Sequence, residues 1–150
     1  ASAILIFFEA TIDGDQANAG AGTGGTATIV FEDSTNQFSW DIQWSGLSAP
    51  AFAGHFHSSA DPGVNAGVIL NFGGISGLSS PSIGDSIIAA SDLADLIAGK
   101  WYINIHTPQF PGGEIRGQVL RSEAPVPAPS TVALMMLAAF GFAARRKRVS

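Results

Sequence analysis

The sequence predicts an antiparallel β-sandwich with one short helix, followed by a C-terminal transmembrane helix. Two observations predict the sandwich. Apolar and polar residues alternate in short runs, which is the period of a strand with one buried face. Eighteen glycines, with Asn, Asp and Pro, separate most of these runs with turn chemistry. A third observation, 21 uncharged residues between Glu123 and Arg145, predicts the membrane segment.

The elements of the predicted sandwich follow in order along the chain. Eight runs have the length and alternation of strands: residues 3–11, 26–31, 38–44, 53–57, 68–72, 86–90, 100–106 and 114–120. Residues 32–37 are typical of a hairpin turn. The one helix is expected near Asp92–Ala98, with Ser91 as its N-cap and Gly99 at its end. Regular strand spacing of this kind favours a sandwich or a partly closed barrel.

Composition divides the chain into three parts: a β domain over residues 1–122, a Pro/Ala linker over 123–129 and an anchor over 130–150. Up to Glu123 the chain holds all twelve acidic side chains and three basic ones, a net charge of −9. Nucleic-acid binding needs clustered cations, so we expect no nucleic-acid partner for the domain. The chain has no cysteine, which excludes disulfides and thiolate chemistry.

The anchor is predicted from a segment that is apolar on all sides. Prolines keep residues 124–129 out of a helix, and Ser130 can cap the helix that follows. Fifteen helical residues, 130–144, would span roughly 22 Å, somewhat less than the bilayer core of about 30 Å. The residues expected to hold it in the membrane are Val132, Leu134, Leu137, Phe140 and Phe142, followed by Arg145, Arg146, Lys147 and Arg148.

The basic end indicates which way the anchor points. Cations flanking a membrane helix stay on the cytoplasmic side. We therefore expect a cytoplasmic C-terminus and a domain on the periplasmic or cell-surface side. Membrane lipid, and other membrane-protein subunits that contact the tail helix, are the expected partners.

Each of three predicted strands has polar side chains on one face and apolar side chains on the other. His55 and His57 share one strand face, and Asn104 and His106 share another. A third strand has a polar set too: Glu114, Arg116 and Gln118. If these strands are neighbours in the sheet, their polar side chains lie together on one face.

Two interpretations of this meeting point stay open. His55, His57 and His106 could bind copper or zinc, since imidazole suits both metals. Alternatively the histidines, with Asn104, Glu114, Arg116 and Gln118, form a buried hydrogen-bonded network that fixes strand register. The second interpretation requires no cofactor. No catalytic residue is predicted, because no serine lies in a nucleophile-elbow pattern and the Gly-rich run opens no helix.

Several motifs together resemble the CHRD (chordin-type) domain. Residues 22–27 read Gly-Thr-Gly-Gly-Thr-Ala, 45–47 read Ser-Gly-Leu and 54–57 read Gly-His-Phe-His. The longest motifs are Tyr-Ile-Asn-Ile-His-Thr over 102–107 and Gly-Gly-Glu-Ile-Arg-Gly-Gln over 112–118. The resemblance implies a secreted all-β domain without a general enzymatic activity. The His-x-His pair is also similar to that of Cu/Zn superoxide dismutase, so the expected topology is an immunoglobulin-like or superoxide-dismutase-like Greek key.

The tail resembles a PEP-CTERM sorting signal of Gram-negative bacteria. Residues 126–131 read Val-Pro-Ala-Pro-Ser-Thr and precede an apolar stretch and a basic cluster, although Ala128 stands where that family has an acid. Three hypotheses follow. The first is a non-catalytic, membrane-anchored extracytoplasmic structural or interaction module, such as an accessory subunit of a membrane protein complex. The second is a histidine-based copper or zinc binding module. The third is an exosortase-sorted surface or matrix protein.

Overall fold

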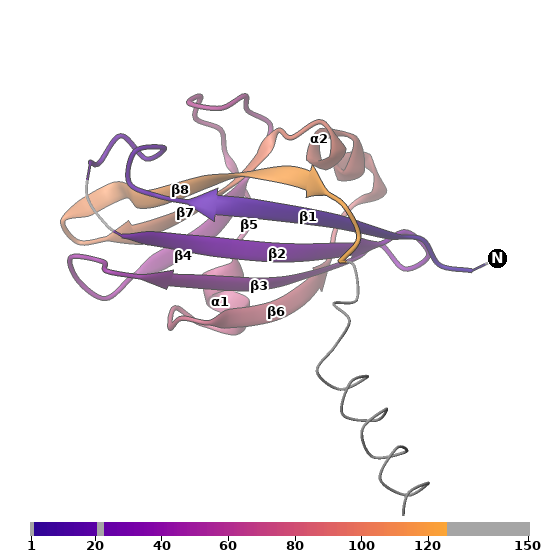
Figure 1. The fold of residues 1–150 in the computed structure, drawn as a ribbon, viewed down its shortest axis with the longest axis horizontal. Coiled ribbons are helices and arrows are strands. Elements are labelled where there is room, and N and C mark those ends of the chain that lie inside the picture. The colour runs from indigo at the N-terminus through magenta and orange to yellow at the C-terminus, as the bar shows by residue number, and fades with distance from the viewer. Residues whose placement is uncertain (1, 21–22, 126–150) are drawn as a thin grey trace, which may run out of the picture.

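The computed structural model describes residues 2–20 and 23–125, which form an all-β domain (Figure 1). Its strands are β1 (Leu5–Ile12), β2 (Gly24–Glu32), β3 (Gln37–Ser45), β4 (Ala53–His57), β5 (Val68–Leu70), β6 (Ser82–Ile87), β7 (Trp101–Thr107) and β8 (Phe110–Ser122). Its helical segments are α1 (Phe72–Ser76), the 3₁₀ turn η1 (Ala90–Asp92) and α2 (Leu93–Ile97). Every strand pairing is antiparallel, as the alternation predicts.

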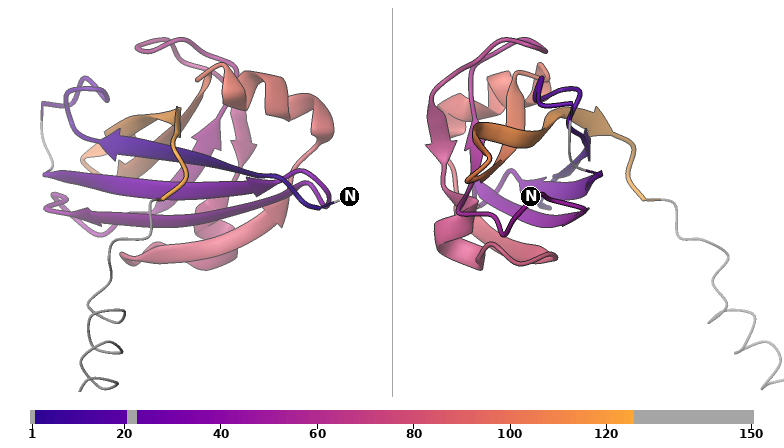
Figure 2. Two further views of the ribbon diagram at one scale, coloured as in Figure 1. Left: turned by 45° about the vertical axis from the view of Figure 1, so that its right-hand side comes forward. Right: turned by 90° about the vertical axis from the view of Figure 1, so that its left-hand side faces the viewer.

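The strands form one continuous sheet in the order β5-β4-β7-β8-β1-β2-β3-β6, which differs from the expected sandwich of two separate sheets. The physical reason is the length of β8. Its 13 residues pair first with β7 and then, near Leu120–Ser122, with β1. One strand thus belongs to both halves of the sheet. The sheet curls so that the two halves face each other (Figure 2).

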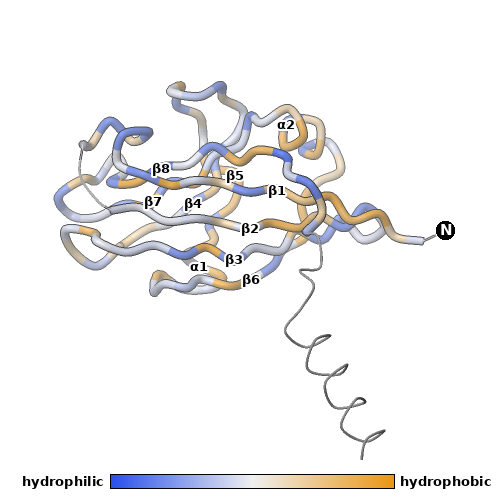
Figure 3. Tube along the Cα trace, in the orientation of Figure 1, coloured by the Kyte–Doolittle hydropathy of each residue, from blue (hydrophilic) through white to orange (hydrophobic). Residues whose placement is uncertain are grey.

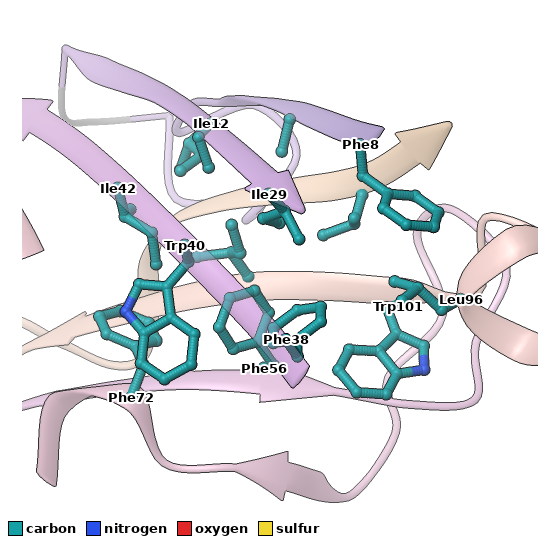
Figure 4. Close-up of a cluster of buried hydrophobic side chains, with 14 of the residues drawn as sticks. Phe8, Ile12, Ile29, Phe38, Trp40, Ile42, Phe56, Phe72, Leu96 and Trp101 are labelled. Atoms are coloured by element: carbon teal, nitrogen blue, oxygen red, sulfur yellow. The ribbon is translucent and has the colours of Figure 1, made fainter. Parts of the chain in front are cut away.

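The core fills the space between the two halves of the curled sheet. Phe38 of β3 meets Phe56 of β4 and Trp101 of β7, with ring centroids 5.1 and 5.2 Å apart (Figure 4). All three side chains are buried. Colouring by hydropathy shows apolar and polar stretches interleaved along the strands (Figure 3). The side chains on the inward face of each strand therefore supply the hydrophobic stabilisation, and those on the outward face are free to form a functional site.

Residues 68–76 differ from the sequence-based expectation. The predicted strand 68–72 stops at Leu70, and α1 begins at Phe72. Asn71 explains the change, because its side-chain oxygen accepts a hydrogen bond from Gly74 N and caps the helix. Phe72 is then carried into the core against Phe56.

Two further elements shift from their predicted positions. β6 covers Ser82–Ile87 instead of residues 86–90, because it pairs with β3 from Gln37 to Ile42. The predicted helix is present as η1 and α2, but Ser91 does not cap it: Asp92 is the N-cap residue, and no side chain caps α2. Gly99, with a φ of 73°, follows the end of α2 as predicted.

The linker from residue 126 and the whole predicted anchor lie outside the described residues. Its membrane-holding residues, Val132 to Arg148, therefore stay a prediction. Within residues 2–20 and 23–125, no helix has the length and apolar character needed to cross a bilayer.

Candidate functional site

The three histidines of the chain lie on the outer face of the β4–β7 pair. Antiparallel pairing places His55 opposite Asn104, and His57 opposite Tyr102, so these four side chains share one face. The opposite face of the same strands is apolar and faces the core, with Phe56 from β4 and the buried isoleucines from β7. The register of one strand pair therefore builds the site.

The structure brings His55, His57 and His106 together. One ring nitrogen from each can be chosen so that all three lie within 4.8 Å of one another. Nδ1 of His55 and Nε2 of His106 are 3.3 Å apart. Two ligands of a tetrahedral metal with bonds of ~2.0–2.1 Å are separated by about 3.4 Å. This pair is already at ligand spacing, and the third nitrogen, within 4.8 Å of the other two, has to approach by at most about 1.4 Å.

Two backbone carbonyls fix the tautomers of His57 and His106. Nδ1 of His57 lies 2.9 Å from the Ala66 carbonyl oxygen, and Nδ1 of His106 lies 2.9 Å from that of Pro111. A carbonyl can only accept, so each Nδ1 carries the proton and each Nε2 is left with a lone pair. This is the arrangement in which a carbonyl orients an imidazole that binds metal through its other nitrogen.

The lone pair of His57 has no partner. His57 is 8% exposed, and its Nε2 is buried without a hydrogen bond among the described residues. A buried polar atom without a partner costs about 1–3 kcal/mol. An ion held among the three rings would satisfy this nitrogen.

The electrostatics of the cluster favour neutral imidazoles. Burial, followed by the nearby His106 and His57, lowers the pKa of His55. Burial is also the largest cause of the lowered pKa of His57, opposed by the hydrogen bond to Ala66 and reinforced by His106 and Arg116. Neutral imidazole is the form that binds a metal.

Tyr102 and the 58–67 loop, which joins β4 to β5, hold His57 in place. The ring of Tyr102 stacks on that of His57, with centroids 4.7 Å apart and an interplanar angle of 2°. The Tyr102 hydroxyl accepts from Ala66 N and donates to Ala66 O, the oxygen that also accepts from His57. The loop and the ring thus orient the imidazole from two sides.

The other predicted site residues do not form one network with one another or with the histidines. Asn104 donates to Gly112 O, and Gln118 donates to Ala60 O and Gly99 O. Arg116 donates to Val64 O and Asn65 Oδ1. In the part of the chain described here, no side-chain hydrogen bond joins any two of Asn104, Glu114, Arg116 and Gln118. Arg116 and Gln118 instead attach the 58–67 loop to the sheet, and Asn104 bonds to the start of β8.

Glu114 is the most deeply buried of these residues, at 0% exposure. Burial alone would raise its pKa, but hydrogen bonds from Thr107 Oγ1, Ser48 Oγ and Ser48 N outweigh burial and lower the pKa of the carboxyl. The carboxylate therefore stays ionised and ties the segment after β3 to β8.

Sequence reasoning missed the partners that orient the histidines. The carbonyls of Ala66 and Pro111 have no signature in sequence, because every residue carries a carbonyl. Tyr102 could have been found, since it shares the strand face of Asn104 and His106 at the same spacing of two.

The family of the chain follows from comparison with known proteins. The family model "CHRD domain" matches residues 8–119, three quarters of the chain, and the chain belongs to this family. A second model, "PEP-CTERM protein-sorting motif", matches residues 125–148. Together they indicate an extracytoplasmic, sorted surface protein. Neither the curated proteins nor the solved structures contain a significant match.

Proposed function

We propose that this CHRD domain is an extracytoplasmic metal-binding module that holds one copper or zinc ion between His55, His57 and His106. One observation carries the proposal. Carbonyls of Ala66 and Pro111 fix the tautomers of two of the three histidines, so that each has a lone pair on Nε2, and the lone pair of His57 is buried with no partner among the residues that the structure describes.

A purely structural network explains the cluster less well. In such a network the buried donors and acceptors satisfy one another. Here the hydrogen bonds that hold the sheet to its loops run through the other nitrogen of His57 and His106, and through Asn104, Glu114, Arg116 and Gln118. The His57 Nε2 atom contributes nothing to that network.

The donor set favours copper or zinc over harder ions. Three neutral imidazoles suit both metals, whereas calcium and magnesium require oxygen ligands. Copper(II) binds a given nitrogen site more tightly than zinc does. His55 is only partly buried, so a fourth, solvent-derived ligand can complete the coordination.

The sorting motif and the tail composition support the cellular setting. We propose that residues 130–150 anchor the domain in the membrane through one helix with a cytoplasmic C-terminus, while residues 123–129 act as a spacer. The domain then stands on the periplasmic or cell-surface side as a non-catalytic module, in contact with lipid and with membrane-protein subunits through its tail. Intact-mass measurement of the membrane-bound protein tests this: loss of residues 145–150 would contradict the anchor.

Metal content is the direct test of the site. The purified chain, loaded with copper or zinc and freed of excess metal, should hold one ion per chain by elemental analysis. The variant His57→Ala should lose it. Tyr102→Phe is the control, because it removes the hydroxyl contact to the same loop, keeps the ring that stacks on His57 and removes no nitrogen ligand. In the copper form, electron paramagnetic resonance should show nitrogen ligation.

Two results would overturn the proposal. One is a wild-type chain that retains no stoichiometric metal. The other is a His57→Ala variant that binds metal as tightly as wild type, since the three histidines are the only ones in the sequence and cysteine is absent.

A further inference from the structure

Within residues 2–20 and 23–125, Arg116 is a buried cation without an acidic partner. Its side chain is 5% exposed, and its guanidinium carbon lies 3.5 Å from the centroid of the Tyr102 ring. Its two hydrogen-bond acceptors, Val64 O and Asn65 Oδ1, are both neutral. Three of its five N–H groups therefore have no side-chain or carbonyl acceptor among the described residues.

Two acids lie close to Arg116, one in the backbone pairing and one in sequence, but both carboxylates accept hydrogen bonds from other residues. Asp13 pairs with Arg116 through the main chain, but its carboxylate accepts from Gln16 N and Nε2. Glu114, two residues away on β8, accepts from Ser48 and Thr107. Buried charges in proteins are as a rule paired or bound to a ligand. The missing counter-charge is unusual in a stretch of chain that, up to Glu123, carries a net charge of −9.

Arg116 and its hydrogen-bond partner Asn65 both line a cleft of about 390 Å³. It is formed by the 13–20 loop, the 58–67 loop and the β7–β8 turn. Arg116 is its one charged lining residue, and its remaining polar side chains are amides: Asn18, Asn65, Asn104 and Gln109. The volume is within the range of small-molecule sites, about 300–1,000 Å³.

We propose that this cleft binds a small anion bearing a carboxylate or phosphate group, which pairs with Arg116. The guanidinium fork matches the two oxygens of either group, and the pairing is stronger in a partly desolvated site than in water. The side-chain amides of Asn18, Asn65 and Gln109 offer donors for the remaining oxygens of the ligand, whereas that of Asn104 already donates to Gly112 O. Because no acid lines the cleft, nothing in it competes for the cation.

This site is separate from the histidine cluster. None of the three histidines lines the cleft. Anion binding can therefore be tested on metal-free protein. A failure of one proposal leaves the other standing.

The test is a titration of the full chain, metal-free and solubilised in a non-ionic detergent. Acetate, malonate and inorganic phosphate are added in turn, and amide chemical shifts are followed by nuclear magnetic resonance. Sodium chloride at matched ionic strength is the salt control. Binding should give saturable shifts at Gly112, Gly113 and Asn18 around the cleft, and the three anions distinguish carboxylate from phosphate.

Variants identify the residue responsible. Arg116→Met keeps much of the side-chain volume and should weaken binding at least about tenfold, the loss typical of a charge-assisted hydrogen bond. Gln109→Glu adds a negative charge at an exposed position on the rim and should weaken binding severalfold without affecting the fold. Gln43→Glu adds the same charge at an exposed position of β3 outside the cleft; it also breaks the exposed hydrogen bond to Asp41, but it should bind the anion like wild type.

The inference fails if none of the three anions gives saturable shifts beyond those of sodium chloride. It also fails if both cleft variants bind as tightly as wild type. Should Arg116→Met not fold, Gln109→Glu decides alone, because its side chain is exposed and makes no side-chain hydrogen bond in the described part of the chain.

Discussion

Acidification of the metal-free protein should destabilise it in a defined pH window. His55 and His57 have pKa values below the ordinary 6.5 in the folded state, because burial and the neighbouring imidazoles disfavour their charged forms. In the unfolded chain both titrate near 6.5. Above that pH both states are neutral at these positions and stability is flat. As the pH falls through 6.5, the unfolded state takes up protons first, so the free energy of unfolding decreases.

The size of the effect is bounded by proton counting. Each proton bound by the unfolded state alone gives a slope of at most about 1.4 kcal/mol per pH unit. Two histidines set a ceiling of about 2.7 kcal/mol per pH unit, and His55, being partly exposed, contributes the smaller share. The loss stops at the folded-state pKa values, below which both states are protonated.

Urea unfolding of the chelator-treated domain between pH 8 and pH 5 measures this dependence. A His55→Asn, His57→Asn double variant should lose most of the slope, since no titrating imidazole remains at these two positions. Zinc should raise the free energy of unfolding and extend the slope to lower pH, because the bound metal keeps the imidazoles of the folded state unprotonated. A wild-type stability that stays constant or rises from pH 7 to pH 5 would refute the reasoning. So would an unchanged slope in the double variant.

Two further predictions concern packing and a buried charge. Gly54→Ala places a Cβ 2.4 Å from a ring carbon of the fully buried Phe72, so it should lower the free energy of unfolding by about 1–3 kcal/mol. Adding Phe72→Leu should recover part of that loss, and a fully additive double variant would contradict the clash. Glu114→Gln should cost about 2–4 kcal/mol in urea unfolding, because it removes the charged acceptor of three hydrogen bonds. Glu123→Gln, at an exposed position, should change stability by less than about 0.5 kcal/mol, and equal losses in the two variants would disprove the role of Glu114.

The sequence by itself determined the class of the fold and the composition of the polar face. Strict period-two alternation leaves each strand only one way to bury its apolar face. His55 and His57 therefore had to share a face, as did Asn104 and His106. The turn at residues 32–37 and the helix end at Gly99 could also be predicted from the sequence, because local backbone chemistry specifies them.

The tertiary structure alone decided how these local pieces combine. Alternation says which way a side chain points but not which strand lies beside it, so only the fold shows that β8 links both halves into one sheet. It also decided that Asn71 and Phe72 start a helix, because burial of Phe72 against Phe56 outweighs the strand pattern. Finally, the carbonyls that orient His57 and His106, and the lack of an acid beside Arg116, depend on long-range loop positions. No residue type encodes a backbone oxygen or a missing neighbour.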